Sequence, residues 1–175
     1  RVRQFVEKIS RSEVDYALSD ANSLLATRHW AEAENICREI LLTYPGNQPA
    51  TLRLAVALLA QGRGLEAADY LRGVQDGAEL LRAQRLQPLA DLLALAEQEQ
   101  TDEVEGLDAQ FAQAGRLIQQ GKYEAGMDGL IDILRQDKRY RKGAAREVLL
   151  AIFDLLGEND DLTKSYRNEL ALVLF

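Results

Sequence analysis

Apolar residues recur at spacings of three and four along most of the chain, which is the pattern of amphipathic helices. The stretch from Trp30 to Gly46 illustrates it, because a small residue, Ala33, is followed at helical spacing by further apolar positions. These positions are Ile36, Cys37, Ile40 and Leu41. Proline and glycine do not continue a helix, so we expect the helix that begins near Trp30 to stop before Pro45.

The same pattern returns further along the chain at a fixed interval. Ala67 stands 34 residues after Ala33, and Ala55 stands 34 residues after Ala21 in the helical segments that precede them. This is the period of the tetratricopeptide repeat (TPR), a unit of two helices joined by a turn. Small residues are needed where paired helices come closest. We therefore expect Trp30 to begin the second helix of a repeat and to pack between its two helices.

The period fails once, which predicts an incomplete unit in the middle of the chain. Thr101 falls where alanine is expected, in the acidic stretch 97–105, and the pattern restarts with Gly126 in the alanine position.

Asp160 or Asp161 can cap the last helix. The sequence therefore predicts an all-α fold, a superhelical TPR-like solenoid of helical hairpins with about nine helices and no sheet. Its predicted parts are a domain tail or linker helix (1–10) and one solenoid (11–175) with repeats 13–46 and 47–79, a degenerate unit 80–103, a repeat 104–137 and closing helices 142–156 and 160–175.

Charge and composition narrow the classes of partner. The 175 residues carry a net charge of −7, which argues against nonspecific nucleic-acid binding because that depends on a basic face. No apolar run reaches the roughly 18 residues of a membrane span. We expect proteins as partners, neither nucleic acid nor membrane, and a monomer or a weak dimer. A single cysteine cannot form an intramolecular disulfide, which favours a reducing compartment.

Residues that could carry catalysis or hold a metal are few. We find no nucleophile motif and no phosphate-binding loop, so we expect no enzymatic activity and no cofactor in this chain. Cys37 lies on an apolar helix face and is expected to be a small buried hydrophobe. His29 lies in a turn and has no second ligand at the spacing of a zinc site. The carboxylates of 97–105 are expected to form a solvated loop and helix start.

The first helices of TPR hairpins line the concave surface, where ligands bind. Repeats that grip a peptide carboxylate need Asn, Lys and Arg there. This chain has Asn22 in one such position, but it has Leu18, Asp108 and Ala112 where cations are needed. We expect no carboxylate clamp, and instead an apolar groove for extended hydrophobic segments, unless these residues are buried between helices. The candidates on this face are Leu18, Asn22, Leu25, Leu52, Arg53, Val56, Leu59, Phe111 and Ile118.

Two further candidate sites lie near the end of the chain. Residues 135–142 contain five basic side chains and one acidic one. Lys138 and Arg139 either stabilise the C-terminus of the preceding helix, where the helix dipole is negative, or dock an acidic partner. Leu172 and Phe175 make the final turn apolar on every side. They either fold back onto the 142–156 helix, meet a second copy of the chain, or anchor a partner protein.

The closing block is specific enough to resemble a family. Its residues are Gly121-Lys122-Tyr123-Glu124-Ala125, Ala145, Leu155-Leu156-Gly157, Tyr166-Arg167, Leu170 and Leu174-Phe175. It resembles the end of bacterial thioredoxin-TPR proteins, the chaperedoxin (YbbN-type) family, and residues 3–9 resemble the last turns of the helix that closes a thioredoxin domain.

The resemblance implies a cytoplasmic bacterial protein that holds unfolding clients and hands them to folding chaperones. The redox cysteines of that family lie in the thioredoxin domain, which we expect this chain to lack, so the resemblance assigns no catalytic residue here. Two alternatives stay open: that the repeats only position a thioredoxin oxidoreductase domain on its substrates, or that they form a generic assembly scaffold.

Overall fold

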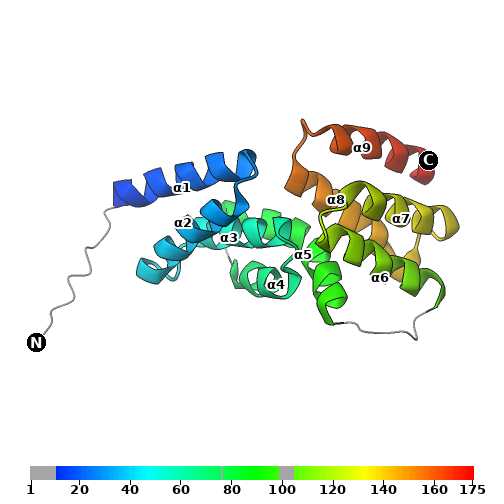
Figure 1. Cartoon of the computed structure of the whole chain (residues 1–175), viewed down its shortest axis with the longest axis horizontal. Coiled ribbons are helices and arrows are strands. Elements are labelled where there is room, and N and C mark those ends of the chain that lie inside the picture. The colour runs from blue at the N-terminus through cyan, green and yellow to red at the C-terminus, as the bar shows by residue number, and fades with distance from the viewer. Residues whose placement is uncertain (1–10, 76, 99–104) are drawn as a thin grey trace, which may run out of the picture.

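The structure, a computed structural model, describes residues 11–75, 77–98 and 105–175. Within these ranges it contains nine α-helices, one short 3-10 helix and no strand, which confirms the all-α, TPR-like solenoid (Figure 1). The expected tail 1–10 and the point at Thr101 where the period fails lie outside the described residues. The helices are α1 (Arg11–Ala26), α2 (Trp30–Thr43), α3 (Gln48–Ala60), α4 (Gly64–Gly73), α5 (Gly77–Gln98), α6 (Gly106–Gln119), α7 (Tyr123–Gln136), η1 (Tyr140–Lys142), α8 (Ala144–Leu156) and α9 (Asp161–Leu174).

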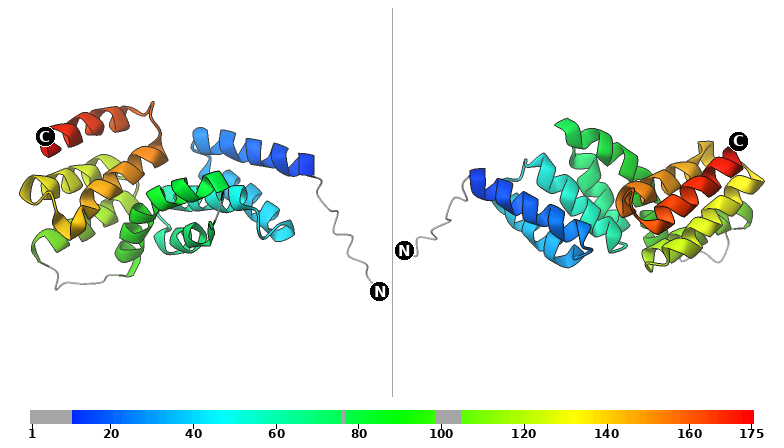
Figure 2. Two further views of the ribbon diagram at one scale, coloured as in Figure 1. Left: turned by 180° about the vertical axis from the view of Figure 1, so that it is seen from behind. Right: turned by 90° about the horizontal axis from the view of Figure 1, so that it is seen from above.

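Helix α5 is shared by two arrays of helical hairpins. The hairpins α1–α2 and α3–α4 lie on one side of it, and α6–α7 and α8–α9 lie on the other (Figure 1, and Figure 2 from behind and from above). Helices α3 and α4 pack on α5 from the first side, and α6 and α8 pack on it from the second. The 22-residue α5 therefore connects the two arrays through direct contacts with both.

Small residues mark the closest helix contacts, as the 34-residue period predicts. Ala33 and Ala67 have no exposed surface. At Gly126, an added Cβ would lie 2.5 Å from Cγ1 of Ile118 and 3.1 Å from the carbonyl oxygen of Ala114. Carbon atoms do not approach that closely without displacement, so only glycine fits where α7 crosses α6.

The tightest contact is that between α4 and α5. An added Cβ at Gly64 would lie 2.3 Å from the Cβ of Leu93 and 2.4 Å from the backbone nitrogen of Ala94. On the other side of α5, a Cβ at Gly115 would lie 2.9 Å from Cδ1 of Leu92. Both arrays therefore approach the same turn of α5 with a glycine. At Gly64 the backbone of α5 limits the spacing, whereas at Gly115 the side chain of Leu92 makes the closest contact.

The end of α5 also satisfies a backbone donor of α4. Glu97 lies in the last turn of α5, and its Oε1 accepts a hydrogen bond of 3.1 Å from the backbone N–H of Leu65. This N–H belongs to the first turn of α4, where backbone donors lack partners within the helix. Glu97 is exposed, but it is a contact between helices rather than part of a loop. Residues 99–104 of the acidic stretch lie outside the described residues, and Glu105 is exposed directly before the first residue of α6.

A charged cluster ties α2 to the α3–α4 hairpin. Arg63 Nη1 donates to both carboxylate oxygens of Glu34, at 2.8 and 2.9 Å, and Gln61 Nε2 donates to Oε2 of Glu34 at 2.8 Å. Arg38 donates to Glu34 at 2.8 Å and to Glu66 at 2.5 Å. Burial raises the pKa of Glu34, but the hydrogen bonds from Gln61, Arg38 and Arg63 outweigh it, and the pKa lies below its ordinary value.

The glycine contact between α4 and α5 generates the first prediction. Gly64→Ala should lower the free energy of unfolding by about 1–3 kcal/mol, because its Cβ has no room beside Leu93. Gly73→Ala is the matched control in the same helix. No atom lies within 4 Å of its added Cβ, so it should be neutral or stabilising by up to about 1 kcal/mol. Urea denaturation measures both, and equal effects would show that the close contact does not constrain the fold.

The charged cluster predicts how stability depends on pH. Folding lowers the pKa of Glu34. Its carboxylate therefore contributes fully to the free energy of unfolding at pH values above its pKa in the unfolded chain. That contribution is lost as the pH falls through its pKa in the folded protein. Glu34→Gln should therefore lower the free energy of unfolding by about 1–3 kcal/mol at pH 7, and by progressively less below about pH 4.5. The exposed Glu39, on the same helix, provides the control Glu39→Gln. Thermal melts from pH 3 to pH 7 that show a constant cost would contradict this account.

Candidate functional site

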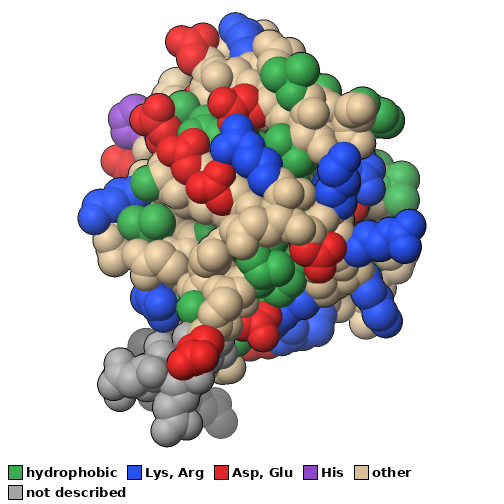
Figure 3. All heavy atoms as spheres, turned by 90° about the vertical axis from the view of Figure 1, so that its right-hand side faces the viewer, with side chains coloured by type: hydrophobic (Ala, Val, Ile, Leu, Met, Phe, Trp, Pro, Cys, Tyr) green, Lys and Arg blue, Asp and Glu red, His purple; other side chains and the backbone are tan. Residues whose placement is uncertain are grey.

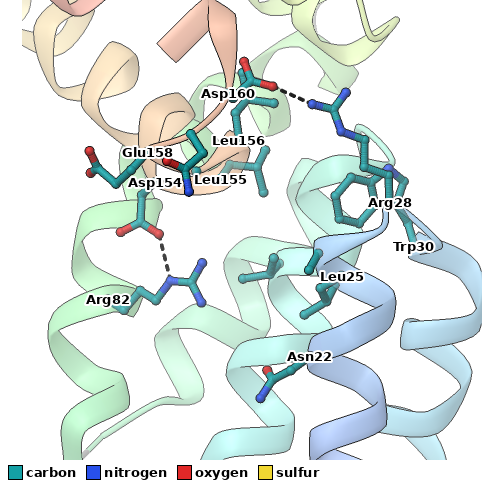
Figure 4. A pocket seen from close by; sticks show the side chains of 14 residues that line it. Asn22, Leu25, Arg28, Trp30, Arg82, Asp154, Leu155, Leu156, Glu158 and Asp160 are labelled. Atoms are coloured by element: carbon teal, nitrogen blue, oxygen red, sulfur yellow. Dashed lines mark hydrogen bonds and ion pairs between the residues drawn. The ribbon is translucent and has the colours of Figure 1, made fainter. Parts of the chain in front are cut away.

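A cleft of about 370 Å³ lies where the two arrays face each other (Figure 4). Its walls come from segments far apart in the sequence. The end of α1, the start of α2 and the middle of α3 form one wall, while the end of α8 and the α8–α9 connection form the opposite wall. Helix α5 contributes Arg82. The cleft therefore exists only when both arrays are folded onto α5.

An ion pair closes one edge of the cleft. Nη2 of Arg28 lies 2.6 Å from Oδ2 of Asp160, across 132 residues of sequence (Figure 4). Asp160 also caps α9, because its Oδ1 accepts from the backbone N–H groups of Leu162 at 2.9 Å and Thr163 at 3.4 Å. The prediction that Asp160 or Asp161 caps this helix is confirmed for Asp160. The capping bonds fix the carboxylate in the position that Arg28 meets.

A second pair of contacts supports the opposite edge. Nε of Arg82 lies 2.7 Å from Oδ1 of Asp154, and Nε of Arg85 lies 3.3 Å from Oδ2 of the same carboxylate. Both arginines belong to α5, and Asp154 belongs to α8. These bonds hold the end of α8 against α5, and α8 carries one wall of the cleft.

The lining between these charged edges is partly apolar. Leu25 and Trp30 are half-buried and border the cleft, and Val56 reaches it from α3 (Figure 4 labels Leu25 and Trp30). Trp30 is the chain's only tryptophan. The repeat pattern predicted a packing role for Trp30 and did not predict its place at the edge of a cleft.

Some of the predicted concave-surface residues meet here. Asn22, Leu25 and Val56 all line the cleft. Arg53 lies beside it and donates from Nε to Oδ1 of Asn22 at 2.7 Å. Burial lowers the pKa of Arg53. Leu18 lies elsewhere, in an open hollow of about 620 Å³ beside the α2–α3 turn.

The expectation of an exposed apolar groove is wrong for the other candidates. Leu52, Leu59, Phe111 and Ile118 are between 1% and 5% exposed, and Val56 shows only 3% of its surface. Leu52, Val56 and Leu59 are buried because α3 packs against four helices, α1, α2, α4 and α5, so nearly every face of α3 is covered. Phe111 and Ile118 lie on α6 and belong to the same hydrophobic core. These side chains hold the helices together, and of the five only Val56 contributes a small exposed edge to the cleft.

The positions compared with a carboxylate clamp have other roles. Tyr140 donates from its hydroxyl to Oδ1 of Asp108 at 2.5 Å, and Arg141 donates from Nε to the same oxygen at 3.1 Å. The hydrogen bond from Tyr140 and the charge of Arg141 hold the pKa of Asp108 below its ordinary value. Ala112 is buried in α6.

The candidates near the end of the chain are exposed. Nζ of Lys138 donates to the carbonyl oxygen of Leu174 at 3.4 Å, so it meets the C-terminus of α9 rather than that of the preceding helix α7. Arg139 is exposed. Leu172 is 82% exposed and Phe175 is fully exposed. The alternative that Phe175 folds back onto α8 is therefore wrong, because α9 packs on the core through Tyr166, Leu170 and the Val173–Leu174 pair, and Phe175 lies beyond them.

The residues considered for metal or thiol chemistry fall in two environments. Cys37 is fully buried, as expected, and burial raises the pKa of its thiol to about 11. His29 is exposed, and its Nδ1 lies 2.9 Å from Oγ1 of Thr27. The described ranges hold no group of three or more His, Cys, Asp or Glu side chains placed to bind a metal ion. None of the helices described is both long enough and apolar enough to cross a membrane.

Sequence reasoning missed the charged residues of the cleft. These are Arg28, Arg82, Asp154, Glu158 and Asp160. The only signal available was the helix cap expected at Asp160, because its partner lies 132 residues away and no local pattern connects the two.

Comparison with known families agrees with this architecture. Two family models, both described as tetratricopeptide repeat, match the chain over residues 24–87 and 82–175, and the second covers more than half of it. The chain belongs to the tetratricopeptide repeat family. The two matches overlap within α5, the helix that the two arrays share. No curated protein and no solved structure matches the chain. TPR arrays are modules for protein–protein interaction.

The two bonds of Asp160 can be separated by mutation. Asp160→Asn keeps a good capping side chain and loses only the ion pair with the largely exposed Arg28, so it should cost less than about 1 kcal/mol. Asp160→Ala loses both the helix cap and the ion pair, so it should lower the free energy of unfolding by about 1 kcal/mol more than Asp160→Asn does. Urea denaturation compares them, with Asp161→Ala as the control. An Asn variant as unstable as the Ala variant would show that the ion pair, and not the cap, fixes this edge of the cleft.

Proposed function

We propose that this TPR module binds extended segments of unfolding client proteins in the cleft between its two arrays, as the TPR part of a chaperedoxin-type co-chaperone. The observation that carries the proposal is the combination of an apolar lining with charged groups of both signs at the edges. Leu25 and Trp30 offer contact to an apolar side chain. Arg28 and Asp160 offer hydrogen bonds to the polar groups on either side of it.

The size of the cleft limits the kind of ligand. About 370 Å³ is at the small end of binding pockets, which suits one or two side chains of an extended chain rather than a helix. Segments with an isolated apolar residue between polar ones are exposed when a protein begins to unfold. The resemblance of the closing block to the chaperedoxin family supports the client-holding role and a place in the bacterial cytoplasm.

A second function uses the same module differently. The repeats could position a thioredoxin oxidoreductase domain on its substrates without holding clients themselves, which the resemblance of residues 3–9 to the end of such a domain supports. A third is a scaffold that binds one folded protein. The three functions differ in what the chain does alone, and that difference can be measured.

Trp30 provides a direct readout of the cleft. The chain should suppress the aggregation of a chemically denatured client at a near-equimolar ratio, as measured by light scattering. Client binding should also change the emission of Trp30, the only tryptophan, when the client lacks tryptophan. Trp30→Ala should weaken client binding by about tenfold, which corresponds to about 1.4 kcal/mol of lost aromatic contact.

The matched control is Tyr16→Ala. Tyr16 is 73% exposed on α1 and is not among the residues that line the cleft, so its removal should leave client binding unchanged. Suppression with unchanged Trp30 emission would move the binding site out of the cleft. If suppression required an attached redox domain, the oxidoreductase role would be favoured. A stoichiometric complex with one folded protein, without suppression, would favour the scaffold.

A further inference from the structure

A second exposed surface lies at the C-terminal ends of α7 and α9, away from the cleft. We propose that this surface, which we call the α7/α9 end, docks an amphipathic helix of a partner protein whose polar flank is acidic. This proposed docking does not depend on client binding in the cleft. Helix α9 begins beside the cleft at Asp160 and runs for 14 residues, so its two ends are about 20 Å apart.

A hollow lined by both charged and apolar side chains forms the centre of the α7/α9 end. It measures about 400 Å³ and is lined by Arg135 and Lys138 from the end of α7 and by Glu169, Leu172 and Val173 from α9. Leu172 is 82% exposed, which is unusual for a leucine in a helix that packs well through its other face. An exposed leucine beside a hollow is the arrangement that receives the apolar stripe of a helix.

Two cations, Arg135 and Lys138, border this hollow in an otherwise acidic protein. The segment 135–142 has five basic residues and one acidic residue, against a net charge of −7 for the whole chain. Arg135 is partly neutralised by Asp132, 2.8 Å away, and by Glu169, 3.8 Å away. Lys138 and Arg139 are exposed, and among the described residues neither of their charged side-chain groups forms an ion pair, although the backbone N–H of Arg139 donates to Oδ1 of Asp137 at 2.8 Å. Figure 3, which faces this end of the molecule, shows Lys and Arg side chains along one side with hydrophobic side chains beside them.

The part of the α7–α8 connection that follows Lys138 and Arg139 is held in place. Arg141 and Lys142 both adopt positive φ, at 45° and 59°, a conformation that is costly for residues other than glycine. Asp108 holds Arg141 at 3.1 Å, and the guanidinium lies 5.5 Å from the ring centres of Phe111 and Tyr140. The connection between α7 and α8 is therefore fixed by contacts to α6. A preorganised surface loses less entropy on binding than a mobile one.

Charge complementarity identifies the occupant. The end of α9 presents Leu172 and the end of α7 presents cations next to it, so a helix with leucine-like residues on one face and carboxylates along one flank meets both. A basic or neutral helix would match only the apolar part. A second copy of this chain could also cover the hollow, and the experiment below separates that case.

Two synthetic helical peptides of about 14 residues test the proposal. Both carry the same leucine stripe, and one has glutamates and the other lysines on the flank. Fluorescence anisotropy with the full chain should show at least tenfold tighter binding of the glutamate peptide at about 50 mM salt, and a loss of that preference at about 500 mM. Equal binding of the two peptides, or binding that salt does not change, would overturn the proposal.

Variants locate the binding surface. Lys138→Glu with Arg139→Glu should weaken binding of the glutamate peptide at least tenfold, while Lys122→Glu with Lys164→Glu, equal in charge and placed elsewhere, should not. Leu172→Ser should also weaken it, against Leu42→Ser, which is 85% exposed on α2.

Circular dichroism and a melt identify any variant that has merely unfolded. If Leu172→Ser has unfolded, Leu172→Ala replaces it, because alanine keeps the helix propensity of α9. Equal effects of site and control variants would overturn the proposal. Sedimentation that detects a dimer abolished by Leu172→Ser would replace it with self-association. Loss of client binding through Trp30→Ala leaves these outcomes unaffected, so the two proposals fail separately.

Discussion

The backbones of α4 and α5 come so close at Gly64 that no side chain fits between them, and the position of α5 follows from that contact. Gly115 makes the corresponding approach from α6 on the other side. Because α5 touches both arrays at this turn, it sets the angle at which one faces the other. The cleft is a product of that angle. Arg28 and Asp160 can meet only when the arrays hold the end of α1 opposite the start of α9.

Much of the fold could be predicted from the sequence because its information is local. Ala33, Ala67 and Gly126 are expected where the paired helices of a hairpin come closest, and each lies within a few residues of the turn that defines its hairpin. Helix caps and stops depend on neighbours in the sequence, as the cap at Asp160 shows. A repeat makes the same contact several times, so the pattern can be recognised even where one unit departs from it.

The candidate site could be predicted only in part, for two physical reasons. The partners of its ion pairs are separated by 72 and 132 residues, and their meeting depends on the angle between arrays. The second reason is the composition of α3. Arg53 is the only charged residue within α3, and a helix that is apolar on nearly every side is buried on nearly every side. The groove expected at Leu52 and Leu59 is therefore the core.

The pairing of α5 with α8 has a consequence for the order of folding. A simple repeat array contains mostly neighbouring contacts, so it can begin to fold at any point and grow from there. Here the second array is complete only when α8 returns to α5, and the bond from Arg82 to Asp154 closes a loop of 72 residues. Closing such a loop costs entropy before its contacts form, which slows folding. We expect α1–α4 to refold first, and α6–α9 to follow as one unit. Stopped-flow refolding, followed by Trp30 fluorescence and by circular dichroism, would resolve this order.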